Sequence, residues 1–315
     1  METNLIMHNQ KKGVLDILKK ALQISSKNIN FIIFILIISS PLFCFLVYYE
    51  FFLQKFLVET FENLYDPPDY FYYYWLEIFH IAERLNKKTF LEFIQLVFLY
   101  LVPLHLLEFC TVLVIVDLTS KIYSEERPMT LKDLLNMPVE VTRLKGTFIT
   151  FVYVAILSVC TLLGLTWLVT TYFILLRSCF SYVLFAAVCG AIFVSVLTIY
   201  SALSAECNMS IVISILEGIY GVEALALSAY FSRGNYRCGL NLMLVFLLWG
   251  IGLRLPCLYF GCYEEGYGIV AQISLVCLGN ALKWIVCVVY FHECKKQILE
   301  KKYDEEVGTD VSAVD

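Results

Sequence analysis

Charged residues are scarce in this chain: Asp, Glu, Lys and Arg make up 16% of its 315 residues, whereas 60% are hydrophobic. A composition this apolar, with a mean hydropathy of +0.74, excludes a soluble globular fold. The basic residues are not concentrated on any one segment, so we expect no direct nucleic-acid partner. The apolar runs are continuous rather than alternating, which excludes a membrane β-barrel.

Enzyme signatures are also lacking. The sequence contains no P-loop, no HExxH, no GxSxG and no aspartate pair typical of a metal-dependent lipid transferase. We therefore expect no catalytic residue, no cofactor and no metal site. Glu77, His80 and Glu83 share one helical face, but three mixed ligands without a fourth are more typical of a solvated face.

Long apolar runs are what the sequence does contain. Each run reaches the ~20 residues that a helix needs to cross the hydrocarbon core. Backbone groups in lipid must bond within the chain, so continuous runs of this kind predict helices. The sequence therefore predicts an all-α, polytopic membrane protein with six transmembrane helices, over residues 30–52, 93–116, 147–168, 181–202, 239–258 and 267–290.

The basic residues are distributed unequally between the two sides of the membrane. With a cytosolic N-terminus, sixteen of the 23 lie in the segments left inside: Lys11, Lys12, Lys19, Lys20, Lys27, Lys121, Arg127, Lys132, Arg143, Lys145, Arg233, Arg237, Lys295, Lys296, Lys301 and Lys302. Only five lie outside. This bias is the positive-inside rule, and it predicts that both termini are cytosolic. The membrane is the endoplasmic reticulum, another endomembrane or the plasma membrane.

Residues 211–234 are long enough to offer a seventh span. Crossing there would leave ten basic residues inside and eleven outside, so the bias would vanish. Glu217 and Glu223 would also cost a few kcal/mol in the membrane. We therefore predict an amphipathic in-plane or re-entrant helix over residues 211–232.

The predicted organisation is a cytosolic basic segment (1–28), a six-helix membrane domain (29–293) and a cytosolic tail (294–315). In the first segment Val14, Leu15, Leu18 and Leu22 share one helical face flanked by lysines, which is typical of a helix lying at the membrane surface. An ordinary juxtamembrane helix without lipid preference is the alternative. Besides the lipid bilayer, we expect cytosolic protein partners at residues 11–27 and 121–146.

The twelve cysteines do not form a disulfide framework, because half of them lie inside predicted spans. Cys257 and Cys262 flank a short outer turn, and we favour free thiols over a disulfide there. Cys294, beside Lys295 at the end of the last span, is either a palmitoylation site or a plain juxtamembrane cysteine. A second packing signal is the set of small residues in 186–191, which favours close helix packing inside the chain over dimerisation.

Ionisable residues inside spans are the default functional candidates. His105 and Glu108 lie one turn apart in the second predicted span, and Lys283 lies at a similar depth in the sixth. We predict a Glu108–Lys283 ion pair with His105 nearby. We favour a structural role for this cluster over a proton or substrate path. Arg254 lies near the outer end of the fifth span, where we expect its side chain to reach toward water.

Residues 212–234 follow the pattern V-x-S-[IV]-L-E-x-x-x-G-x-x-A-L-x-x-S-x-x-x-x-[RK]-G. The pattern resembles a plant multi-spanning family whose members are labelled "transmembrane protein" or "polyadenylate-binding protein 1-B-binding protein". Residues 15–22 and 289–296 are similar to that family's ends. A fainter likeness extends to the membrane domain of bacterial glycerophosphodiester phosphodiesterases. The resemblance implies the six-span layout and contributes no site residues, since no biochemical activity is established for that family.

Two functions from different classes follow. The first is a non-catalytic membrane protein that scaffolds or recruits partners. The alternative is a small-solute or ion transporter that uses Glu108, His105 and Lys283, although the chain shows no matched internal repeat. A lipid-modifying enzyme is a weaker third hypothesis. The sequence does not predict the oligomeric state.

The topology is directly testable. A reporter fused after Asp315 should be accessible only from the cytosol, because an even number of crossings returns the chain to its starting side. Protease added to the opposite face of intact membranes should leave the reporter whole. Its digestion from that face would contradict six spans.

Overall fold

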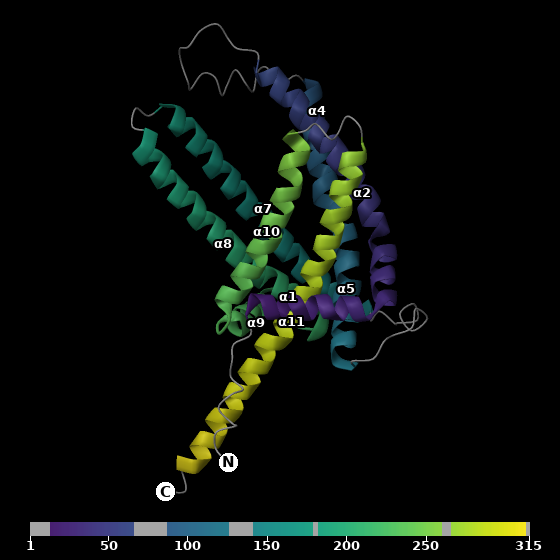
Figure 1. The fold of residues 1–315 in the computed structure, drawn as a ribbon, viewed down its shortest axis with the longest axis vertical. Helices are drawn as coiled ribbons and strands as arrows, with labels where there is room; N and C mark the ends of the chain where they lie inside the picture. The colour runs from purple at the N-terminus through teal and green to yellow at the C-terminus, as the bar shows by residue number, and fades with distance from the viewer. Residues whose placement is uncertain (1–12, 66–86, 126–140, 179–181, 260–265, 313–315) are drawn as a thin grey trace. The chain divides into compact units, whose positions relative to one another are not determined.

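The computed structural model describes residues 13–65, 87–125, 141–178, 182–259 and 266–312, and these residues contain helices and no strand (Figure 1). The protein is all-α, as predicted. Six helices are long and apolar enough to cross a membrane: Ile29–Glu59, Leu91–Ser124, Leu144–Thr161, Gly190–Leu216, Tyr236–Cys257 and Tyr267–Glu300. They correspond in order to the six predicted spans, so the chain is a multi-pass membrane protein.

The helices are α1 (Val14–Lys27), α2 (Ile29–Tyr65), α4 (Lys87–Leu99), the π-helix η2 (Tyr100–Leu104), α5 (His105–Glu125), α7 (Val141–Ser178), α8 (Tyr182–Leu216), α9 (Val222–Ser232), α10 (Tyr236–Tyr259) and α11 (Tyr267–Ser312). Several run past the predicted ends. Thus α2 continues beyond residue 52, and α11 carries the predicted tail as far as Ser312. Apolarity marks where hydrocarbon ends, but helical hydrogen bonds continue into water.

The chain forms two compact units. Unit 1 comprises Met1–Ile35, Val112–Leu248 and Ala281–Asp315, and unit 2 comprises Leu36–Thr111 and Trp249–Asn280. Unit 1 therefore holds α1, α7, α8 and α9 with parts of α5, α10 and α11. Unit 2 holds α4 and η2 with most of α2, the first turns of α5, the last turns of α10 and the first turns of α11.

In unit 1, α7 and α8 form an antiparallel hairpin (Figure 1). The small residues of α8 do not pack as predicted. Ala187, Gly190 and Ala191 are exposed, and a Cβ added at Gly190 would meet no atom within 4 Å. Among the described residues, this face of α8 therefore makes no close helix contact in the chain.

The helix predicted over residues 211–232 is shorter in the structure. Residues 211–216 complete α8 and are almost fully buried, and only Val222–Ser232 form α9. Gly218 and Gly221 adopt positive φ angles of 69° and 65°, a region that glycine tolerates, and they turn the chain between the two helices. The Gly221 N–H donates to Thr150 Oγ1 at 2.8 Å and ties this turn to α7. With 11 residues, α9 is too short to cross a membrane.

In unit 2, α10 and α11 approach closely at a glycine. A Cβ added at Gly279 would lie 2.7 Å from Trp249 Nε1, and this indole donates to the Leu275 carbonyl at 3.3 Å. A small hydrophobic cluster of Cys257, Ile269 and Ile273 lies further along the same helices, with Val47 of α2 packed against it.

Replacing Gly279 by Ala should lower the melting temperature of the purified protein, because the new methyl group must displace the Trp249 ring from its hydrogen bond. We expect a cost of about 1–3 kcal/mol, the usual range for overpacking. Gly250→Ala is the matched control, since a Cβ there meets nothing within 4 Å. That control should be neutral or slightly stabilising, because Ala is the better helix former. Equal melting temperatures for the two variants would contradict the close approach.

Candidate functional site

The N-terminal helix α1 is the predicted partner segment, and the structure shows how it is held. Asp16 Oδ2 accepts a hydrogen bond from the Gly13 N–H at 3.0 Å, which satisfies a donor at the start of the helix. Ile17 and Ala21 are its buried residues. Leu15 and Leu22, which we assigned to the apolar face, are 79% and 54% exposed. The helix therefore has two apolar faces, one packed on unit 1 and one directed outward.

The side chain that fastens α1 is Lys20. Its Nζ donates to Tyr123 Oη of α5 at 2.6 Å and to Glu293 Oε1 of α11 at 3.2 Å. The Tyr123 hydroxyl also donates to Glu293 Oε1 at 3.4 Å, and Lys20 Nζ lies 4.3 Å from the centre of the Tyr123 ring. We call Lys20, Tyr123, His292 and Glu293 the Lys20 cluster. It joins three helices that are far apart in the sequence (Figure 1).

The Lys20 cluster is shielded from water on one side. The Glu293 side chain is only 6% exposed, whereas that of Lys20 is 38% exposed. The Tyr123 ring stacks on the His292 ring with centroids 4.5 Å apart, and Ser120 Oγ lies 3.3 Å from His292 Nε2. Burial by itself lowers the pKa of Lys20, but the hydrogen bonds to Tyr123 and Glu293 outweigh it and raise the pKa above 10.5. Lys20 therefore stays charged at physiological pH.

The next turn of α11 is tied to the segments around α9. Asn235 Nδ2 donates to Gln297 Oε1 at 2.7 Å, and Lys295 Nζ lies 2.5 Å from Glu217 Oε1. Between them Cys294 is 1% exposed, with its Sγ 3.9 Å from Asn235 Nδ2. The alternatives at Cys294, a palmitoylation site or a plain juxtamembrane cysteine, both stay predictions.

A second polar group lies in unit 2 and centres on Glu50, which is 0% exposed. Arg254 Nη2 donates to Glu50 Oε2 at 3.0 Å. Gln54 Nε2 and Gln272 Nε2 donate to Glu50 Oε1 at 3.2 and 3.4 Å, and Gln54 Nε2 also lies 3.3 Å from Gln272 Oε1. We call these four residues the Glu50 cluster. It joins α2, α10 and α11 within unit 2.

The Glu50 cluster compensates its buried charge by pairing. An isolated carboxylate out of water costs several kcal/mol, and good geometry with further hydrogen bonds is what offsets this cost. Here one guanidinium and two amide groups share the carboxylate. Arg254, expected only to reach toward water, does so with 49% of its side chain exposed while it also pairs with Glu50.

The predicted intramembrane set is divided between the units. In unit 2, His105 Nδ1 lies 2.7 Å from the Tyr100 carbonyl oxygen, and the two rings meet edge to face at 4.9 Å. Glu108 is half-buried in the next turn. In unit 1, Lys283 is half-buried with its Nζ 4.8 Å from the centre of the Trp284 ring. The Glu108–Lys283 pair would join the two units and stays a prediction.

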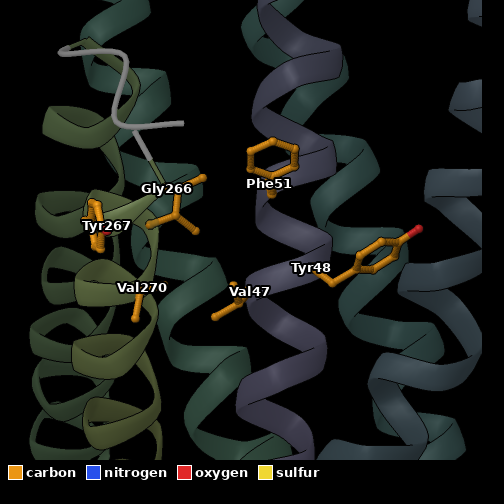
Figure 2. A pocket seen from close by; sticks show the side chains of 7 residues that line it. Val47, Tyr48, Phe51, Gly266, Tyr267 and Val270 are labelled. Atoms are coloured by element: carbon orange, nitrogen blue, oxygen red, sulfur yellow. The ribbon is translucent and has the colours of Figure 1, made fainter. Parts of the chain in front are cut away.

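Unit 2 also contains an apolar groove of about 410 Å³ between α2 and the start of α11. Figure 2 shows its two walls, with Val47 on one side and Val270 on the other. The lining residues are Val47, Tyr48, Phe51, Gly266, Tyr267, Ile269 and Val270. None carries a charge, and all except Gly266 belong to candidate membrane spans. The groove suits a hydrocarbon chain rather than a charged solute.

No family model, curated protein or solved structure matches the chain. The plant-family resemblance therefore stays a prediction. Within the described ranges, no group of three or more His, Cys, Asp or Glu side chains is placed to hold a metal ion. Glu77, His80, Glu83, Cys262 and most of the 121–146 segment lie outside those ranges, so the metal-site and Cys257–Cys262 predictions stay predictions.

The intramembrane site residues predicted from the sequence include neither Glu50 nor Lys20, on which the two clusters centre. Glu50 could have been recognised from the sequence, because it is the only Asp, Glu, Lys, Arg or His of the predicted span 30–52. Gln54 and Gln272 were harder to recognise from the sequence, since amide side chains are common near the ends of spans. Lys20, Tyr123 and Glu293 are ordinary interfacial residues in the sequence, and only the fold brings them together.

Replacing Lys20 by Met should loosen α1 while keeping the length of the side chain. We expect the free energy of local opening of α1 to fall by about 1 kcal/mol, because a partly exposed charge-assisted hydrogen bond is lost. Hydrogen–deuterium exchange of peptides covering residues 14–27 measures this. Lys19→Met is the control, since Lys19 is exposed on the same helix. Equal exchange in both variants would contradict the anchoring role of Lys20.

Proposed function

We propose that this multi-pass membrane protein is a non-catalytic recruiting platform that presents α1 and the end of α11 to cytosolic partners. The observation that carries the proposal is that α1 packs on the protein with one face and exposes the opposite face. One face is held to α5 and α11 by the hydrogen bonds of Lys20 and buries Ile17 and Ala21, whereas the opposite face, with Leu15 and Leu22, is exposed.

The open face has the chemistry of a recognition surface. Leu15, Lys19 and Leu22 lie on successive turns and are exposed, so they combine two apolar anchors with a positive charge. An amphipathic helix with this pattern fits either an apolar groove of a protein or an anionic membrane surface. Because α1 is already ordered, it loses less conformational entropy on binding than a flexible tail would.

The long helix α11 supplies a second feature. It has 46 residues, whereas crossing the hydrocarbon takes ~20, so its C-terminal part extends past the membrane. Its turn around residues 293–297 is held by α1 on one side and by the α9 and α10 region on the other. Partners that bind α1 would therefore bind next to a rigid helix.

Proximity labelling from a tag at the N-terminus tests the proposal. Wild type should label a reproducible set of cytosolic proteins, and the Leu15→Ser/Leu22→Ser variant should lose most of that set because its apolar anchors are removed. Leu36→Ser/Ile37→Ser is the control, because these two apolar side chains belong to α2 and are 56% and 59% exposed. An unchanged protein set in the α1 variant would contradict recruitment through this face.

Solute transport is the second candidate, and one observation favours it. The candidate span that contains His105 and Glu108 is interrupted by the π-turn η2 around Pro103, and His105 Nδ1 lies 2.7 Å from the Tyr100 carbonyl oxygen at that turn. Interrupted helices often border substrate routes in transporters. Flux into vesicles reconstituted with the full chain, compared with Glu108→Gln, distinguishes the two: flux lost in the variant supports transport, and equal flux contradicts it.

A further inference from the structure

The Arg254–Glu50 pair is asymmetric in its exposure. The Glu50 side chain is 0% exposed, whereas that of Arg254 is 49% exposed. An exposed guanidinium spares the cost of removing a second charge from water. One edge of the guanidinium is held by the protein and the rest is left accessible.

The contact uses little of the guanidinium. Glu50 Oε2 accepts from Nη2 alone, at 3.0 Å, and among the described residues Arg254 has no further hydrogen-bond partner. A guanidinium has five N–H donors in a planar fork that matches the oxygens of phosphate or carboxylate in pairs. Four donors therefore remain for a ligand.

The carboxylate of Glu50 contacts one edge of the Arg254 guanidinium only. Glu50 Oε1 accepts from Gln54 at 3.2 Å and from Gln272 at 3.4 Å, so the negative charge is shared among donors on three helices. Part of the stabilisation of Glu50 thus comes from uncharged amides. The outward edge of Arg254 keeps positive potential, and its position is fixed before any ligand arrives, which reduces the entropy lost on binding.

The depth of Arg254 in the membrane indicates which ligand its guanidinium can reach. It lies 18 residues from the start of α10 at Tyr236, or about 27 Å along the helix, close to the ~30 Å thickness of the hydrocarbon. Tyr259, one turn further, is 86% exposed, as is typical of aromatic residues at the membrane–water boundary. The anionic groups concentrated at this level are the phosphates of lipid headgroups.

We propose that the outward edge of Arg254 binds a phosphate group, with Glu50, Gln54 and Gln272 as the residues that position it. The phosphate belongs to a phospholipid headgroup or to a soluble phosphate, which share the same chemistry. The proposal does not depend on the recruiting function, because it concerns other residues in the other unit.

The test uses a variant in which no buried charge is left without its counter-ion. Arg254→Gln alone would leave Glu50 buried without its counter-ion and endanger folding. The informative variant is therefore Glu50→Gln/Arg254→Gln, which removes both charges and keeps groups of similar size. Glu50→Gln alone keeps the guanidinium and frees it from the carboxylate. Lys55→Gln is the charge control, because Lys55 is an exposed cation on α2 just beyond Gln54.

Native mass spectrometry of the full chain, released from detergent micelles containing dioctanoyl phosphatidic acid, measures retention of the lipid. Wild type and Lys55→Gln should retain it equally, and Glu50→Gln should lie between wild type and the double variant, because it loses the positioning carboxylate and keeps the guanidinium. The double variant should bind roughly tenfold more weakly, the loss expected for a charge-assisted hydrogen bond. Dioctanoylglycerol, which lacks the phosphate, should be retained equally by all four proteins.

A second arm identifies the source of the phosphate. Inorganic phosphate that raises the melting temperature of wild type but not of the double variant would indicate a soluble ligand. Phosphatidic acid retained without any effect of inorganic phosphate would indicate the headgroup. Equal retention by wild type and the double variant, together with no effect of inorganic phosphate, would overturn the proposal. A loss in Lys55→Gln as large as that in the double variant would also overturn it.

Discussion

Hydrocarbon offers no hydrogen bonds, and the whole structure depends on that constraint. Every backbone N–H and C=O inside the bilayer must bond within the chain, which leaves helices as the form available to continuous apolar runs. The same constraint removes the usual force that packs helices, because lipid tails are as apolar as the leucines that face them. Close packing and polar contacts must therefore hold these helices together.

The two polar clusters serve this purpose within their own units. The Glu50 cluster joins three helices through one carboxylate, and the Lys20 cluster joins three through one ammonium. In each cluster one charged side chain binds partners from distant parts of the sequence. This arrangement determines which helices pack together, since packing against a different helix would leave a buried charge without its partner. Apolar contacts alone would not discriminate in this way.

The number and order of the spans were predictable, because they depend on composition over about twenty residues and on the distribution of lysine and arginine. The limits of the helix over 211–232 were not. The decisive features are Gly218 and Gly221, whose positive φ angles break the helix, and the sequence alone does not reveal whether a glycine uses that freedom. The same holds for α1, where Leu15 and Leu22 had the expected periodicity, yet Ile17 and Ala21 pack on the protein.

The polar sites were predicted least well, for a physical reason. An ionisable residue deep in a span is conspicuous, which drew attention to His105, Glu108 and Lys283. Residues near the ends of spans look like ordinary interfacial groups, because water is close enough to solvate them there. Yet pairs form most readily at that level: desolvation is partial, so the cost of burying one partner is smaller than at mid-membrane. Glu50 fully buried with Arg254 half exposed fits this balance, as does Glu293 buried with Lys20 partly exposed. In both pairs the carboxylate is inside and the long basic side chain reaches it from the surface. That arrangement uses the flexible stem of Arg or Lys to keep its charged group near water while its partner holds the helices together.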